Sequence, residues 1–448
     1  MLTVSEAQSR VADLVAAATR SGADAADALY ACDAATQVSV RLGALEDVGR
    51  SEGEEIGLRV FVGRRSASVS SSDLSPDALG VLVERAVAMA REAPEDPWSG
   101  LAPQDRLMHG TAPNLDLVDR HSAEPAALKE RALAAEDAAR AIAGVTNSEG
   151  AGASANHALI AIGTSHGFTG GYETTGFGCS ASVIAGSGAG MQRDYAYHSA
   201  RHQADLEDPA TVGQRAGERA VARLNPGKLA SGPMPVLFDP RVGAGLLGHL
   251  VGAITGSAIA RKTSFLLDAL GSQIFAKGVT ISDDPHRPRG LRSRPFDGEG
   301  LPTGPRDIVA DGVLTGWLMD SASARQLHLE PTGHATRGIG GSPGAGASNL
   351  FLERGLVSVE GLMSDIRLGV FVTELIGQGV NGVTGDYSRG ASGFVIRDGA
   401  LAEPVAEITI AGNLKDMFRQ LTAADDLVFR RAIDVPTIRI DGMTIAGA

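Results

Sequence analysis

The chain is poor in cysteine, because only Cys32 and Cys179 occur among its 448 residues. Two cysteines cannot build a disulfide framework, and their separation matches no spacing typical of a metal site. We interpret both as free thiols of a reducing cytoplasm, where disulfides are rare. Residues 1–22 place Glu6 and Asp13 inside an amphipathic pattern, which indicates a surface helix rather than a signal peptide. We therefore expect a cytoplasmic protein.

Basic residues are fewer than acidic residues. The formal net charge is −13 and the pI is near 5.3. Nucleic-acid binding needs a basic footprint, so this balance argues against a nucleic-acid partner. Long apolar runs are also scarce: apart from His249, residues 242–260 carry no ionisable side chain. Glycines make that run only weakly apolar, so we expect no membrane span.

Glycine and small apolar residues are what the chain has in quantity. It has 57 glycines, 43% hydrophobic residues and only 4% aromatics, which predicts a core built on small side chains. Periodicity predicts helices at 2–21, 75–91, 123–143 and 209–224. Alternation predicts strands at 37–43, 55–72 and 145–205, the last as a meander of short strands.

The fold class that follows is α+β, with helices packed on mixed or antiparallel sheets. Pro-Gly breaks interrupt the pattern at 225–235. They predict two domains, an α+β domain at 1–228 and a β-rich domain at 229–448. Residues 283–306 are charged and rich in proline and glycine, which predicts a long loop.

Known catalytic motifs are mostly missing. The glycine-rich segments at 186–190 and 338–348 do not fit the dinucleotide pattern GxGxxG, and we interpret them as tight turns or sites of close backbone packing. His198 and His202 are four residues apart and would share one face of a helix. Two histidines without a neighbouring glutamate leave zinc one protein ligand short, so we interpret this pair as a surface feature.

The weakly apolar run at 242–260 predicts a packed helix with a lone histidine. Gly245, Gly248, Gly252 and Gly256 recur at spacings of three and four, so they form a smooth stripe along one side. Each glycine lowers helix propensity by about 1 kcal/mol relative to alanine. We therefore expect the stripe to pack closely against the core of the chain or against a partner.

Four long strings resemble one known family. They are GLLGHLVGAITG (245–256), FLLDALGSQI (265–274), GVFVTELIGQGVNGVTGDYSRGASGF (369–394) and EITIAGNLKDMF (407–418). Together they are similar to the TldD/PmbA family, and in particular to its PmbA (TldE) branch. The resemblance implies a two-domain α+β subunit that pairs with a TldD-like catalytic subunit in a cytosolic zinc peptidase. Unfolded peptides and the leaders of peptide antibiotics are the implied substrates, and the older label "modulator of DNA gyrase" belongs to the same family.

The resemblance also implies that this chain lacks the zinc site. In the TldD branch the helix carries HExxxH, and a late cysteine completes the site. The positions of the two histidines are Gly248 and Ala253 here, His249 stands at the position of the glutamate, and no cysteine follows Asp425. We therefore expect no catalytic residue, no metal ligand and no cofactor in this chain, with zinc held by the partner subunit.

The string at 381–394 is the best candidate to face the substrate or the partner. Its glycines permit sharp turns, and Asp386 and Arg389 would fix the loop by a charge-assisted hydrogen bond. A purely structural hairpin is the alternative for this string. The candidate residues are Asn381, Thr384, Asp386, Tyr387, Ser388 and Arg389.

Two other functions stay open at this point. The chain could be a stand-alone adaptor that binds peptides, or a peptidase with an unrecognised site such as His198 and His202. Whether it forms a homodimer when alone is also open.

Overall fold

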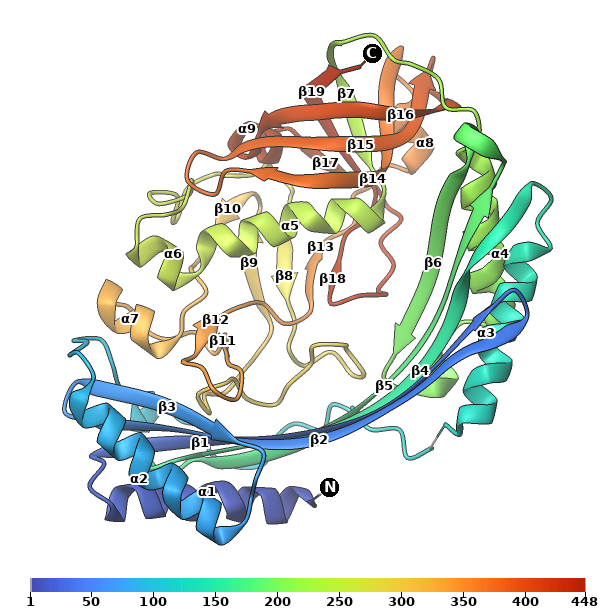
Figure 1. Cartoon of the computed structure of the whole chain (residues 1–448). Helices are drawn as coiled ribbons and strands as arrows, with labels where there is room; N and C mark the ends of the chain where they lie inside the picture. The colour runs from blue at the N-terminus through green and yellow to red at the C-terminus, as the bar shows by residue number, and fades with distance from the viewer. Residues whose placement is uncertain (1, 122, 448) are drawn as a thin grey trace.

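The computed structural model describes residues 2–121 and 123–447. A long, curved sheet from the first half of the chain wraps around the second half, and four helices cover its outer face (Figure 1). All strands of the curved sheet precede residue 201, and the strands of the other sheets follow residue 231. The boundary predicted between residues 228 and 229 falls in the connection between them.

The curved sheet has six antiparallel strands in the order β3-β2-β1-β4-β5-β6. The predicted strands at 37–43 and 55–72 are confirmed, but β1, β2, β4 and β5 are far longer than expected. Ala, Gly and Ser fill many of their positions, so hydrophobic alternation is visible only over short parts of each strand. The strands are β1 (Ala25–Arg41), β2 (Ala44–Val62), β3 (Arg65–Ser71), β4 (Val145–Thr164), β5 (Thr169–Ala185) and β6 (Gln192–Ala200).

The four predicted helices of the first half are confirmed. Three of them begin with proline, whose fixed φ suits the first turn. Thr3 and Glu6 form a capping box at the start of the first helix. Two helices cover one end of the curved sheet and two cover the other (Figure 1). They are α1 (Val4–Arg20), α2 (Pro76–Glu92), α3 (Pro125–Arg140) and α4 (Pro209–Ala222), with short 3-10 turns at Gln104–Arg106, Gly188–Gly190 and Gln203–Asp205.

The second half contains a mixed six-stranded sheet of order β16-β15-β14-β7-β19-β17. Its one parallel pair joins β14 to β7, and β16 also pairs with β19, which curls the sheet on itself. The expected mixture of helices with mixed and antiparallel sheets is confirmed. The strands are β7 (Gly232–Phe238), β14 (Leu368–Val380), β15 (Asp386–Arg397), β16 (Ala400–Asn413), β17 (Leu421–Ala423) and β19 (Ile438–Ala446).

A smaller sheet of order β10-β9-β8-β13-β18 lies on the other side of helix α5 (Figure 1). The largest apolar core of the described residues gathers side chains from α5 and from both sheets. No described helix is long and apolar enough to cross a membrane. The remaining elements are α5 (Pro240–Ile254), α6 (Gly256–Ala260), β8 (Ile281–Asp283), β9 (Arg306–Ala310), β10 (Val313–Leu314), α7 (Ser321–Leu327), β11 (Ala335–Thr336), β12 (Gly344–Ala345), β13 (Leu350–Leu352), α8 (Val359–Met363), α9 (Leu414–Arg419) and β18 (Ile433–Asp434).

Buried charges join the curved sheet to the second half. Asp27 on β1 pairs with Arg59 on β2 and, at 2.8 Å, with Arg337 from the segment between β11 and β12. All three side chains are at most 6% exposed. Burial alone would raise the pKa of Asp27, but the two guanidinium groups hold it below its usual value. One carboxylate therefore pairs with two cations at the junction.

Replacing Asp27 by asparagine tests this junction. The change removes the carboxylate that pairs with both buried cations, and loss of one partner of a buried pair typically costs about 3–5 kcal/mol. We expect a loss of that size in the free energy of unfolding, measured by urea denaturation. Asp33→Asn, at an exposed position of the same strand, is the matched control and should change stability by less than about 0.5 kcal/mol. Equal denaturation midpoints for the two variants would contradict the prediction.

A second buried acid lies close to this junction. Glu299 is 4% exposed, and one of its oxygens accepts hydrogen bonds from the backbone N–H and the hydroxyl of Ser321, at 2.8 and 2.7 Å. Burial and then the charge of Asp297 raise the pKa of Glu299 from its ordinary 4.5 to about 7. Between these values the folded protein keeps a proton that the unfolded chain has released. Stability from this group is therefore full below pH 4.5 and is lost as the pH rises through 7.

Glu299→Gln keeps an oxygen acceptor for Ser321 and removes the titration. We expect the free energy of unfolding of the unmodified protein to fall, relative to the variant, by roughly 2–3 kcal/mol between pH 4.5 and 8. Urea denaturation of both proteins across that pH range measures the difference. Parallel pH profiles would show that Glu299 is ionised in the folded state at neutral pH.

Candidate functional site

Helix α5 begins at Pro240, two residues before the predicted helix at 242–260. The Asp239 carboxylate accepts a hydrogen bond from the backbone N–H of Arg241 at 2.8 Å, and Pro240 occupies the first helical position. The predicted helix at 242–260 is interrupted at Thr255, whose extended backbone ends α5 and whose hydroxyl caps α6. Two helices therefore replace the single one expected.

The glycine stripe lies on the exposed face of α5. A β-carbon added at Gly245, Gly248 or Gly252 would meet no atom within 4 Å, whereas one at Gly256 would clash with Ser323 and Met319. The expectation of close packing against the core is therefore wrong for three of the four glycines. Leucines on the opposite face already fill the core, so the helix has only one buried side; they are Leu246, Leu247 and Leu250.

The three positions that match the zinc-binding helix have different surroundings. Gly248 faces open space and has no side chain to offer, while Ala253 is only 5% exposed and apolar. His249 is half-buried, with the edge of its ring set against Tyr387 at 6.1 Å between centroids. One imidazole does not provide the three protein ligands that a catalytic zinc needs, so these residues do not fit the metal.

Other metal ligands are also not assembled nearby. Cys32 and Cys179 are buried in strands β1 and β5 of the curved sheet. Within residues 2–121 and 123–447, no group of three or more His, Cys, Asp or Glu side chains is arranged to hold a metal ion.

The β14–β15 hairpin carries the other predicted residues. The side-chain oxygen of Asn381 accepts from the backbone N–H of Val383 at 2.9 Å, which shapes the turn. Asp386 accepts from the hydroxyl of Thr384 at 2.6 Å and from the amide of Asn413 at 3.1 Å. These contacts fix the hairpin and tie it to the end of β16.

The predicted hydrogen bond between Asp386 and Arg389 is wrong. Arg389 instead donates from Nε to the carbonyl of Ile376 at 3.3 Å. Both residues lie on strand β15, where positions three apart point to opposite faces. The carboxylate and the guanidinium therefore cannot meet.

The structure brings His249 together with Tyr387 and Arg389. Burial and then the charge of Arg389 lower the pKa of His249, so its imidazole is neutral at physiological pH. Tyr387 is 2% exposed, and burial raises its pKa to about 12. Tyr387 is thus a packing residue under α5, whereas four of the predicted residues are exposed: Asn381, Thr384, Asp386 and Ser388.

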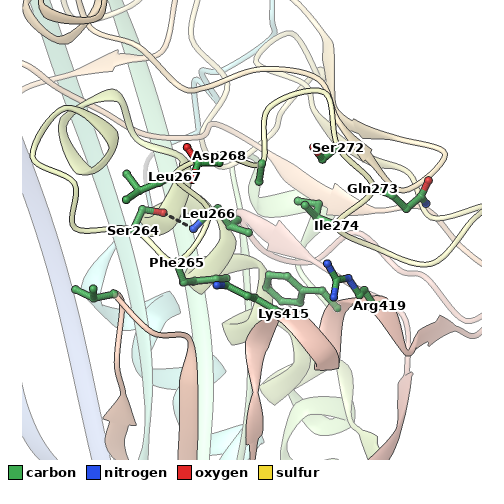
Figure 2. Close-up of a pocket in the computed structure, with 13 residues that line it drawn as sticks. Ser264, Phe265, Leu266, Leu267, Asp268, Ser272, Gln273, Ile274, Lys415 and Arg419 are labelled. Atoms are coloured by element: carbon green, nitrogen blue, oxygen red, sulfur yellow. Dashed lines mark hydrogen bonds between the residues drawn. The ribbon is translucent and has the colours of Figure 1, made fainter.

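A pocket of about 440 Å³ lies beside the hairpin tip (Figure 2). Its floor is apolar, with Phe265, Ile274 and Phe418, and Lys415 and Arg419 stand at its edge. Three of the four family strings meet here, since the lining comes from 264–274, from the hairpin and from α9. Sequence reasoning missed this pocket because its walls are about 150 residues apart, although its residues lie within the quoted strings.

The histidine pair His198 and His202 has a different geometry from the one expected. His198 lies on strand β6 and not on a helix, because residues 192–200 pair with β5. Its Nδ1 accepts from the backbone N–H of Glu207 at 3.1 Å. Nε2 of His202 lies 2.9 Å from the carbonyl of Asp116. Backbone contacts therefore occupy one nitrogen of each ring, and the helical pairing of the two histidines is wrong.

Two substitutions separate the positions that match the zinc ligands. Gly248→His places the new ring in open space, so we expect little change in melting temperature. Ala253→His forces a ring into the core and should destabilise the protein by about 1–3 kcal/mol or more, because overpacking strains the surrounding side chains. Thermal unfolding measures both variants. Equal melting temperatures would mean that residue 253 is not buried.

Family models match most of the chain. The PmbA/TldA metallopeptidase domain 1 matches residues 34–90, the central domain matches 120–224 and the C-terminal domain matches 231–447. The chain is 41% identical to Metalloprotease PmbA of Escherichia coli O157:H7, over 95% of this chain and 92% of the relative. It is 38% identical to the Metalloprotease PmbA homolog of Haemophilus influenzae, over 99% and 96%.

Solved structures share the fold along the whole chain. A protein from Bacteroides thetaiotaomicron, named as a modulator of DNA gyrase, is 28% identical with a TM-score of 0.92, over 100% of both chains. TldE from Thermococcus kodakarensis is 22% identical with a TM-score of 0.87, over 99% of this chain and 100% of the other. At that identity the second likeness concerns the fold alone.

Proposed function

The chain belongs to the PmbA/TldA metallopeptidase family, and on that premise we propose that it is the non-catalytic, TldE-like subunit of a heteromeric zinc peptidase. Its partner is a TldD-like subunit that carries the zinc and activates water. The substrates are unfolded peptides or peptide leaders. The assembly works in the cytoplasm, where buried free thiols such as Cys32 and Cys179 stay reduced.

The single observation that carries the proposal is the chemistry of helix α5. Its three positions that match the HExxxH motif hold Gly248, His249 and Ala253, and only one of them offers a donor atom. His249 is turned toward Tyr387, and Ala253 lies in the core. Similarity to a protein named as a metalloprotease is compatible with this role. This chain would be one subunit of the peptidase, and the other subunit would perform the hydrolytic step.

An exposed surface beside α5 supports a role in assembly. Gly245, Gly248 and Gly252 leave the helix backbone open to close approach, and the hairpin adds the exposed apolar side chains Ile376 and Val383. A closed chamber would admit an unfolded chain and hold it by main-chain hydrogen bonds, which do not depend on sequence. Folded proteins would be excluded by its width.

Reconstitution tests the subunit role. We expect neither this chain nor the matching HExxxH-bearing subunit to cleave an unfolded fluorogenic peptide efficiently alone, and the mixture to raise the rate at least tenfold. Zinc removal with a chelator should abolish the activity of the mixture. Metal analysis of the separate chains should assign zinc to the partner.

The two alternative functions predict different outcomes in the same experiment. Stoichiometric zinc and peptidase activity in this chain alone would contradict the proposal and favour an unrecognised site. Peptide binding without any gain on mixing would favour a stand-alone adaptor. Gel filtration of the chain alone decides whether it forms a homodimer.

Gly252→Leu sharpens the test of the α5 surface. The added side chain enters open space, so the melting temperature should stay within a few degrees of the unmodified protein. Binding to the TldD-like subunit, measured by titration calorimetry, should weaken at least tenfold. Gly80→Leu on α2, which also enters open space, is the matched control and should bind normally. Unchanged binding by both variants would remove the α5 face from the interface.

A further inference from the structure

A cationic pocket of about 490 Å³ lies between the inner face of the curved sheet and the second half of the chain. The sheet contributes Tyr172 and Thr174 from β5. Arg292 and Arg294 come from the long loop at 284–305, which connects β8 to β9, and Arg201 follows β6. No aspartate or glutamate lines the pocket. Three guanidinium groups therefore share one cavity in a chain whose net charge is −13.

None of the three arginines forms an ion pair with a described carboxylate. Arg201 donates only to backbone carbonyls, those of Thr175, Gly290 and Leu291. Arg294 donates to the carbonyls of Ala335 and Gly346, at 3.0 and 3.5 Å, and its Nε is buried without a hydrogen-bond partner. Burial raises the pKa of Asp297 and the charge of Arg294 acts against that rise, yet the two side chains form no ion pair.

Arg292 is the arginine of the three that is most accessible to a ligand. It is exposed, and its only described hydrogen bond is donated by its backbone N–H to the side-chain oxygen of Asn349 at 2.9 Å. Its guanidinium group can therefore turn to a ligand without giving up a structural contact. Arginine binds a carboxylate through two parallel hydrogen bonds, which makes it the suited cation for such a ligand.

Several other arginines of this fold have acidic partners. Arg337 pairs with Asp27, and Arg241 pairs with Asp194 at 2.9 Å. Buried charges are normally paired in this way, because an unpaired charge loses hydration without compensation. The arginine pocket, formed by Arg201, Arg292 and Arg294 around Tyr172, departs from this pattern and is therefore suited to an anion brought from outside.

The hydroxyl of Tyr172 provides a further donor. Burial raises its pKa, and the charges of Arg294 and Arg201 act against that rise, so both cations stand close to the hydroxyl. The hydroxyl stays protonated at neutral pH and donates to no other described residue. An anion in the pocket would accept from it.

The rest of the lining is apolar and lies near α5. Ile160, Val251 and Ile433 line the pocket together with the cations. Val251 follows Gly248 by three residues, so the two are neighbours on the surface of α5. The pocket thus adjoins the helix whose exposed face supports the proposed assembly.

We propose that the arginine pocket binds the C-terminal carboxylate of a peptide substrate whose last residue is apolar. The guanidinium groups and the Tyr172 hydroxyl hold the carboxylate, and Ile160, Val251 and Ile433 contact the last side chain. A free phosphate would use the cations but leave this apolar wall unused, so the pocket suits a peptide end better. The inference rests on the proposed function, which supplies the peptide.

A pair of labelled peptides tests the pocket on the full chain alone. Both have the same unstructured sequence ending in leucine, one as the free acid and the other as the C-terminal amide. Fluorescence anisotropy should give at least a tenfold lower Kd for the free acid. Arg292→Gln should weaken binding of the free acid at least tenfold and leave the amide unchanged.

Control measurements distinguish binding in the pocket from a general effect of charge and from a loss of folding. Arg85→Gln, on the exposed side of α2, removes the same charge elsewhere and should leave both Kd values unchanged. Arg292→Gln should keep the melting temperature, since its guanidinium group makes no described contact. Inorganic phosphate should displace the free acid only at concentrations far above the Kd of the peptide. Equal Kd values for the two peptides, or tighter binding of phosphate than of the free acid, would overturn the proposal.

The cleavage assay gives an independent readout. A mixture with the TldD-like subunit that cleaves acid and amide with the same KM, together with equal Kd values, contradicts the pocket and leaves the subunit role intact. Preference for the acid by this chain, combined with no gain on mixing, keeps the pocket and contradicts the subunit role.

Discussion

Charge neutralisation at the junction of the two halves is the constraint on which the rest of the structure depends. An apolar cluster containing Phe168 and Phe296 crosses from the concave face of the curved sheet to the second half. Arginines complete the contact. Arg337 pairs with Asp27, and Arg325 donates to the backbone carbonyls of Trp98, Gly100 and Leu101. Planar guanidinium groups with five donors suit this task, because they satisfy buried acceptors on both sides of a thin interface.

Packing within the second half sets where helix α5 lies and which of its faces is free. The leucine face of α5 packs between two sheets, while the glycine face is exposed. Gly248 lies outside the core, whereas Ala253 lies within it. The exposed glycine face is the surface that we propose for the partner.

The long loop at 284–305 has two tasks that depend on its charges. Asp297 fixes the loop by accepting backbone N–H bonds from Glu299, Leu301 and Ala335. Arg292 and Arg294 then project cations toward β5, where the sheet offers hydroxyl groups and no carboxylate. No aspartate or glutamate lines this cavity, and its cationic lining is the basis of the role that we propose for the loop.

Periodicity and capping residues alone were enough to predict helices α1 to α4 and the α+β class, because these features depend on neighbours a few residues apart. The sequence also determined that position 248 offers no donor to a metal. Tertiary structure decided the environment of each face. The sequence located the glycine stripe but did not determine whether it faces the core or solvent. Asp386 and Arg389 form no hydrogen bond, because β15 is a strand and the two side chains point to opposite faces. The arginine pocket contains Arg201 and two arginines of a loop some 90 residues away. No local sequence pattern predicts this arrangement, because only the folded chain brings distant charges into one cavity.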